Sequence, residues 1–187
     1  MNDLLPQAYL LGLIALLGVA AIVVGRQILR VRRDELALAR LGGNDKAAGG
    51  PRDASTLYEL ASVQLRKRLY AEAQANLRQA LKLAEAENAP AEARALMENA
   101  LGFTLAAQNN YSAAVRHYRA ALRAKADYPV ALNNLAFALE KQSKADEARS
   151  LYEKVLQLEA TNKTARKRLS MLERRSGRQA SESGKAS

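Results

Sequence analysis

The sequence contains no cysteine and only one histidine, His117. Without cysteine the chain cannot form a disulfide bond, a thiolate metal site or a cysteine nucleophile, and one imidazole cannot build a zinc cluster. Neither a GxGxxG nor a GxxxxGK[ST] phosphate-binding loop occurs. We therefore expect His117 to be an ordinary surface or boundary residue, and the protein to have no enzymatic activity, metal or cofactor.

Residues that break helices are also scarce. The 187 residues include 10 glycines and 4 prolines, and 5% are aromatic, whereas 49% are apolar. This composition is typical of a helical globular protein and not of a disordered or fibrous one. At roughly 100 to 200 residues per domain, the length allows one compact domain with appendages.

Charge is missing from residues 4–25, which include the apolar run AYLLGLIALLGVAAIVVG. About 20 such residues in a helix cross the hydrocarbon core of a bilayer. A cleaved signal peptide begins with basic residues, but here only Asp3 and the amino terminus precede the run. The sequence favours an uncleaved single-pass transmembrane anchor over residues 1–25, rather than a signal peptide or a buried core helix.

Basic residues follow the apolar run directly. Four arginines precede the next acidic residue: Arg26, Arg30, Arg32 and Arg33. Basic residues stay on the cytoplasmic side and attract anionic lipid, so we expect the C-terminal part on the cytoplasmic or stromal side. Residues 26–41 are predicted to form a basic juxtamembrane helix. Residues 42–53, with four glycines and a proline, are predicted to be a flexible linker.

The net charge of +10 is unevenly distributed. Residues 26–50 carry +3, residues 51–160 only +2, and residues 161–187 carry +6. The C-terminal basic block could be a solvated cap, a second lipid contact or a nucleic-acid patch. Because no aromatic residues for base stacking lie near it, nucleic acid is an unlikely partner.

The sequence repeats itself after residue 53. The pairs Leu101-Gly102 and Leu135-Ala136 are 34 residues apart, and Leu60-Ala61 lies 41 residues before the first of them, which indicates an insertion of seven. A period of 34 is typical of the helix-turn-helix repeats of the tetratricopeptide repeat (TPR) family, which the sequence resembles. Small residues recur at the positions where two helices of such a repeat approach: Ala61, Gly102 and Ala136; Ala73, Ala114 and Ala148; Ala80, Ala121 and Val155.

These patterns predict an all-α fold: an N-terminal single transmembrane helix followed by a three-repeat TPR superhelix with a C-terminal capping helix. The repeats are expected within residues 54–160, at about 54–87, 95–128 and 129–162. The capping helix is expected at residues 161–175, with Ala165, Leu169 and Leu172 as its apolar stripe. Residues 176–187 are expected to be disordered.

The best candidate site is the concave groove that the first helices of TPR repeats line. On the predicted register the groove contains the only two phenylalanines of the chain beside asparagine amides, and this combination suits the binding of a polypeptide. The candidate protein-binding residues are Tyr58, Leu65, Arg66, Asn99, Phe103, Asn133, Phe137 and Lys141. The alternative is that the two phenylalanines only pack within the protein. Ser62 and Val130 replace the asparagine and lysine of the carboxylate clamp found in chaperone-binding TPR domains, so we expect an internal or apolar segment as ligand.

The order of parts over residues 4–172 resembles the membrane-anchored TPR assembly factor family of photosystem I in cyanobacteria and plastids. The resemblance implies a thylakoid protein without a cofactor that binds subunits or assembly intermediates of photosystem I. A bacterial inner-membrane TPR adaptor in envelope or secretion machinery is the main alternative. An RNA-binding membrane protein is a third.

Overall fold

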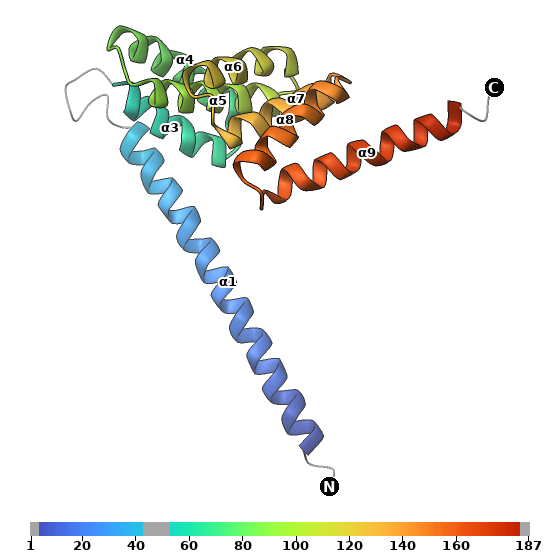
Figure 1. The fold of residues 1–187 in the computed structure, drawn as a ribbon. Coiled ribbons are helices and arrows are strands. Elements are labelled where there is room, and N and C mark those ends of the chain that lie inside the picture. Colours follow the sequence, from blue (N-terminus) through green and yellow to red (C-terminus); the bar gives the residue numbers. More distant parts are fainter. Residues whose placement is uncertain (1–3, 43–52, 184–187) are drawn as a thin grey trace. The chain divides into compact units, whose positions relative to one another are not determined.

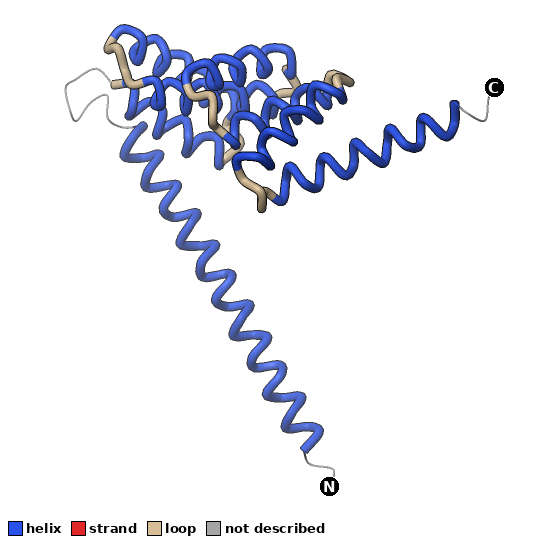
Figure 2. Tube along the Cα trace, in the orientation of Figure 1, coloured by secondary structure: helices blue, strands red, loops and turns tan. Residues whose placement is uncertain are grey.

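The computed structural model of the protein describes residues 4–42 and 53–183. Within these ranges the chain forms eight α-helices. No strand occurs among the described residues (Figure 2). The chain divides into two compact units, Met1–Gly50 and Pro51–Ser187. The predicted all-α class is therefore confirmed, and the predicted linker lies almost wholly outside the described residues.

Helix α1 (Leu4–Gly42) forms the first unit. Its 39 residues correspond to about 58 Å at 1.5 Å per residue. Residues Leu10–Leu41 make it long and apolar enough to cross a membrane, and none of its most apolar stretch is buried within the protein. The helix includes the four arginines without a break, so the apolar stretch and the basic stretch form one continuous helix.

Three helical hairpins follow in the second unit (Figure 1). The first helix of each hairpin packs on the second, and each second helix packs on the first helix of the next hairpin. The helices are α3 (Ala54–Arg66) and α4 (Tyr70–Ala86), α5 (Ala91–Ala107) and α6 (Tyr111–Ala124), and α7 (Pro129–Lys141) and α8 (Ala145–Leu158).

The seven inserted residues lengthen two helices and leave the connections unchanged. Helices α4 and α5 each have 17 residues, whereas α6 and α8 have 14, and α3 and α7 have 13. Three inserted residues thus extend α4 and four extend α5, which is about one turn each. Helix α5 accordingly begins at Ala91, directly after Pro90, so its inserted turn precedes residue 95, where the period predicts the second repeat to begin.

The core of the hairpins follows the predicted register. The large residues that face the small positions are fully buried: Leu77, Tyr118 and Tyr152. The small residues are buried as well: Ala61, Ala73, Ala80, Gly102, Ala114, Ala121, Ala136, Ala148 and Val155. Gln64 replaces the bulky apolar residue that is usual at its position. It is buried because its Oε1 accepts a hydrogen bond from Nδ2 of Asn76 at 2.8 Å, which satisfies the side chain inside the hairpin.

Each hairpin turns in three residues, and the middle residue is left-handed. Arg68, Asn109 and Ser143 all have φ of 62°. In each turn the next amide donates to a carbonyl five residues back, at 2.9 Å, which is the hydrogen bond of a Schellman motif. The repeated turn makes each second helix return along its first helix at a similar angle.

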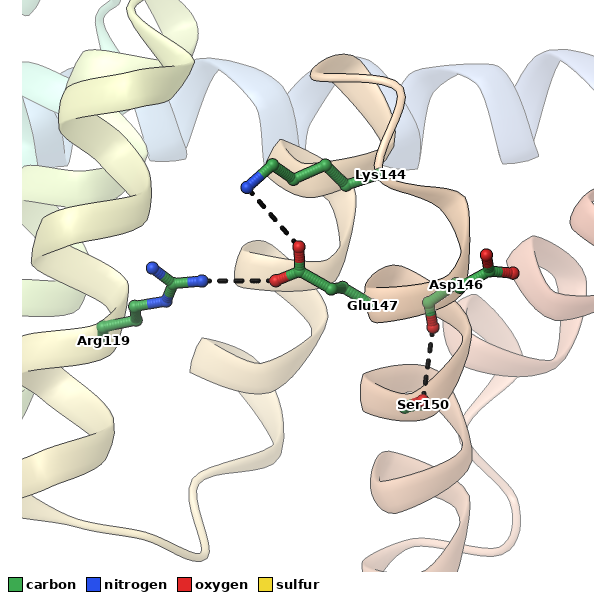
Figure 3. A network of polar contacts seen from close by, with 5 residues as sticks. All are labelled: Arg119, Lys144, Asp146, Glu147 and Ser150. Carbon is green, nitrogen blue, oxygen red and sulfur yellow. Dashed lines mark hydrogen bonds and ion pairs between the residues drawn. The ribbon is translucent and has the colours of Figure 1, made fainter.

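One exposed ion pair connects the second helices of the last two hairpins, and two further polar contacts lie at the start of α8 (Figure 3). Glu147 of α8 pairs with Arg119 of α6 at 3.3 Å and with Lys144 at 3.4 Å, and the Ser150 hydroxyl donates to the carbonyl of Asp146 at 3.2 Å. Exposed pairs of this kind contribute at most about 1 kcal/mol. Stacking of the repeats therefore depends mainly on the buried residues.

Helix α9 (Lys163–Ser183) packs on α8 through the predicted stripe, since Ala165 and Leu172 are buried and Leu169 is partly buried. It differs from the prediction in length, because the cap was expected to end at Arg175 and residues 176–183 were expected to be disordered. The loss of apolar periodicity after Leu172 marks the point where the side chains become exposed, not the end of the helix. Proline is absent throughout α9, so nothing in its sequence stops the helix.

Candidate protein-binding groove

The first helices of the second and third hairpins present large apolar side chains to solvent. Leu96 and Phe103 of α5 are 42% and 46% exposed, and Val130 of α7 is 53% exposed. Leu96 and Val130 are 34 residues apart and so occupy equivalent positions, and Phe103 lies about two helical turns after Leu96 on the same face. We call these three residues the apolar patch. The prediction included only Phe103, although the recurrence of apolar residues at positions 96 and 130 was readable in the sequence.

Phe137 is less accessible than its equivalent Phe103. The ring of Tyr111 meets it edge-on, with centroids 6.5 Å apart. Two cations lie over the ring: Arg168 Cζ of α9 at 4.7 Å and Lys141 Nζ at 5.4 Å from the centroid. The predicted equivalence of the two phenylalanines is therefore incomplete, because the capping helix partly covers Phe137.

The asparagines at the predicted groove positions connect neighbouring repeats. Asn99 accepts a hydrogen bond from Asn134 Nδ2 at 3.0 Å and donates one to the Tyr128 hydroxyl at 3.4 Å. Burial, and secondarily the nearby Tyr58, raises the pKa of Tyr128. The hydrogen bonds to Asn134 and Tyr128 therefore hold Asn99 between the second and third hairpins.

Asn133 repeats this arrangement one hairpin later. Its Nδ2 donates to Asn162 Oδ1 at 3.4 Å, and Asn162 also caps α9 by accepting from the amide of Ala165 at 3.0 Å. Asn99 and Asn133 therefore each contact the residue 29 positions onward. Within the described residues, the Oδ1 of Asn133 is buried and accepts no hydrogen bond.

Two other predicted groove residues, Leu65 and Arg66, lie at the end of α3. Leu65 is partly buried against the core, and Arg66 is exposed, with Nη1 donating to the Ser62 carbonyl at 3.3 Å. The Ser62 hydroxyl donates to the Tyr58 carbonyl of its own helix at 2.8 Å. Because Ser62 is engaged with its own helix and Val130 is apolar, these two positions do not supply the polar groups of a carboxylate clamp.

Beyond α7 the same face continues on α9 and becomes basic. Thr164, Lys167 and Met171 follow Val130, Asn133 and Phe137 by 34 residues each. An open hollow of about 410 Å³ is lined there by Lys163, Thr164, Lys167, Arg168 and Met171. We call this hollow the basic end of the groove. The prediction placed these residues in the capping helix but treated the basic block as a feature separate from the groove.

A buried carboxylate connects the basic end to the core. Glu140, whose side chain is 7% exposed, accepts from the Tyr152 hydroxyl at 2.9 Å and pairs with Arg168 at 3.6 Å. Burial, followed by the Glu140 carboxylate, raises the pKa of Tyr152. Arg168 is therefore held between Glu140 and the Phe137 ring.

Two further predictions concern residues outside the groove. The predicted basic residues lie on α1, where the spacing of Arg26, Arg30 and Arg33 places these three on one helical face. His117 of α6 contacts Glu98 of α5, with Nδ1 2.7 Å from Oε2. Among the residues that the structure describes, no group of three His, Asp or Glu side chains is arranged to hold a metal ion.

Comparison with known proteins identifies the repeats. Tetratricopeptide repeat family models match residues 54–87, 95–125 and 130–161. The uncharacterised protein ycf37 of Guillardia theta is 31% identical over 172 residues, which cover 92% of this chain and 94% of that protein. The chain belongs to the ycf37 family of tetratricopeptide repeat proteins. This membership confirms the family resemblance that the sequence indicated.

A longer plant protein is similar to this chain over most of its length. The chloroplastic tetratricopeptide repeat domain-containing protein PYG7 of Arabidopsis thaliana is 33% identical over 168 residues, which cover 90% of this ycf37-family chain. The match covers 54% of PYG7, so the chain spans about half of that protein's length. The ycf37 protein of Cyanophora paradoxa is 35% identical over 114 residues, 61% of this chain and 64% of that protein.

Solved structures similar to this ycf37-family protein are TPR proteins. The first TPR domain of Spaghetti (RPAP3), bound to an HSP90 peptide, matches with a TM-score of 0.61 at 19% identity, over 66% of this chain and 93% of that chain. The Cut9 and Hcn1 assembly matches with a TM-score of 0.71 at 18% identity, over 79% of this chain and 28% of that chain. These likenesses concern the fold alone. Membership of a tetratricopeptide repeat family makes the protein a non-enzymatic interaction scaffold.

Proposed function

We propose that this ycf37-family protein is a membrane-tethered scaffold that binds protein segments during assembly or stabilisation of photosystem I. Its order of parts resembles the photosystem I assembly factor family, and its relative PYG7 is named a chloroplastic protein. The partners are subunits or assembly intermediates of that complex. The protein needs no cofactor for this role, because binding depends on side chains of the repeats.

The proposed tether is α1. Its apolar stretch has the length to cross a bilayer, and the arginines at positions 26, 30, 32 and 33 lie at the anionic lipid surface. By the positive-inside rule we expect the repeats on the cytoplasmic or stromal side of a thylakoid membrane. Proteolysis of sealed thylakoid vesicles tests this topology, since the repeats are expected to be digested without detergent.

The observation that carries the binding role is the apolar patch on α5 and α7. Large exposed apolar residues gathered on one face are typical of interaction surfaces, and an aromatic side chain is a common energetic centre. Of the predicted groove residues, Phe103 is the one whose ring is most open to a ligand. Tyr58, Asn99, Asn133 and Phe137 form the polar and aromatic floor beside it.

Co-purification tests the proposed function. Tagged full-length protein is isolated from detergent-solubilised thylakoids, and the bound proteins are identified by mass spectrometry. We expect photosystem I subunits to be enriched, and Phe103→Ala to lower their recovery roughly 10-fold, as loss of a central aromatic contact does. Leu158→Ala is a matched control, because Leu158 is 40% exposed but lies at the end of α8.

Two results would contradict parts of the proposal. Recovery of the same subunits with Phe103→Ala would exclude the apolar patch as the binding surface. Absence of photosystem I subunits from the wild-type preparation, with other proteins recovered instead, would refute the role in that complex.

A further inference from the structure

The groove changes its chemical character along the stack. On α5 and α7 it presents the apolar patch, whose residues are uncharged and 42–53% exposed. On α9, in the same 34-residue register, it presents Lys167 together with Lys163 and Arg168. A single extended ligand that follows the face therefore meets apolar side chains first and cations next.

The basic end carries an excess of positive charge. The residues that line its hollow include three cations and no carboxylate. Lys141, over the Phe137 ring, adds a fourth cation beside it. Among the ion pairs of the described residues, Glu140 is the one carboxylate paired with this group, and it is 7% exposed and shared between Arg168 and the Tyr152 hydroxyl. One buried acid cannot balance four cations, so the surface is complementary to an anionic ligand.

The neighbouring groups favour protein over nucleic acid. Single-stranded nucleic acids bind to basic grooves through aromatic rings whose faces are open to bases. Phe137, the ring beside these cations, already carries Arg168 and Lys141 over it. The open apolar side chains of Leu96 and Val130 fit aliphatic side chains of a polypeptide better than they fit bases.

We propose, building on the proposed function, that the groove binds an internal protein segment in which apolar side chains adjoin a cluster of Asp or Glu residues. The apolar side chains contact Leu96, Phe103 and Val130. The side-chain carboxylates contact Lys163, Lys167 and Arg168 at the basic end. This inference adds the chemical class of the partner segment to the binding role.

Synthetic peptides test the inference with the full-length protein in phosphatidylcholine nanodiscs. The probe is a fluorescent 14-residue peptide with four leucines followed by four glutamates, and its amidated C-terminus removes the terminal carboxylate. The comparison peptide has glutamine at the four glutamate positions. We expect the glutamate peptide to bind at least 10-fold more tightly at low salt, and the difference to shrink at high salt because of screening.

Variants of the basic end locate the interaction. Lys167→Glu is expected to weaken binding of the glutamate peptide about 10-fold, whereas Lys167→Arg retains it. Lys82→Glu makes the same charge change at an exposed residue of α4 and is expected to leave binding unchanged. Equal affinity for the two peptides, or equal effects of Lys167→Glu and Lys82→Glu, would overturn the inference.

Two further measurements distinguish this inference from the proposed function and from the binding of anionic lipid. If Phe103→Ala lowers the capture of partner proteins but the protein does not prefer the glutamate peptide over the glutamine peptide, the proposed function stands and the acidic segment is refuted. Nanodiscs that contain phosphatidylglycerol test the lipid alternative. The inference is also overturned if Lys167→Glu weakens the protein's binding to phosphatidylglycerol vesicles and leaves peptide affinity unchanged.

Discussion

A β-carbon added to Gly102 would lie 2.7 Å from two ring atoms of Tyr118. The ring belongs to α6, is 1% exposed and has no room to move, so the bare backbone of Gly102 allows α5 and α6 to approach. The other hairpins have Ala61 and Ala136 at this position. The second hairpin therefore depends on glycine where its neighbours tolerate alanine.

Gly102→Ala is expected to destabilise the repeats. Overpacking a core costs about 1 to 3 kcal/mol, which exceeds the helix-propensity gain of at most about 1 kcal/mol. Denaturant unfolding followed by circular dichroism should show a lower free energy of unfolding. Gly177→Ala in α9 is the control, since an added β-carbon there meets nothing within 4 Å. A Gly102→Ala variant as stable as wild type would contradict the packing argument.

The hairpin turns offer a stabilising substitution. Arg68 has φ of 62°, a left-handed conformation in which its β-carbon is strained and glycine is not. Arg68→Gly should raise the free energy of unfolding by about 0.5 to 1 kcal/mol. Asn109→Gly, at the same φ, should change it less, because asparagine tolerates this conformation. Equal effects of the two substitutions would argue against strain at Arg68.

The sequence predicted the parts of the fold that depend on period and residue size. The 34-residue spacing and the small residues at Ala73, Ala114 and Ala148 were sufficient to place three hairpins and their core. The period indicated the seven-residue insertion but not how it lengthens the helices on both sides of Pro90. The length of α9 was missed because an exposed helix needs no apolar periodicity.

The sequence predicted which helix positions form the candidate site but not the contacts that its side chains make. The register placed Phe103 and Phe137 at equivalent positions, but Arg168, more than 30 residues further on, makes their environments different. The contact of Asn99 with Tyr128 joins two repeats and depends on how they stack. Contacts between repeats depend on how the repeats stack, and the sequence of a single repeat does not determine that geometry.

The buried tyrosines predict a loss of stability at alkaline pH. Burial raises the pKa of Tyr118, and burial followed by Glu140 raises that of Tyr152. Above about pH 10 the unfolded chain loses these protons and the folded chain retains them, so the free energy of unfolding falls as pH rises, by up to about 1.4 kcal/mol per pH unit for each phenol. Below pH 10 both states are protonated, and this stabilisation is fully present.

Unfolding midpoints measured from pH 8 to pH 11 check this prediction. Tyr118→Phe removes one of the two phenols and should make the alkaline decline shallower. An unchanged slope in this variant would assign the decline to other titrating groups.

The hydrogen bond from Tyr152 to Glu140 is expected to hold the capping helix. Tyr152→Phe leaves the buried Glu140 carboxylate with Arg168 at 3.6 Å as its remaining ion-pair partner. Loss of a donor to a buried charged acceptor costs about 1 to 3 kcal/mol. Amide hydrogen exchange in α9 should become faster, because the carboxylate that positions Arg168 is itself less well held.

A double-mutant cycle separates this bond from loss of packing. Glu140→Gln combined with Tyr152→Phe should destabilise the protein by less than the sum of the two single changes, with a coupling of about 0.5 to 3 kcal/mol. Additive effects would show that Tyr152 supports α8 by packing alone. Because Glu140 also pairs with Arg168, which lies over Phe137, the coupled result would make this α7–α8 hydrogen bond a determinant of the shape of the basic end.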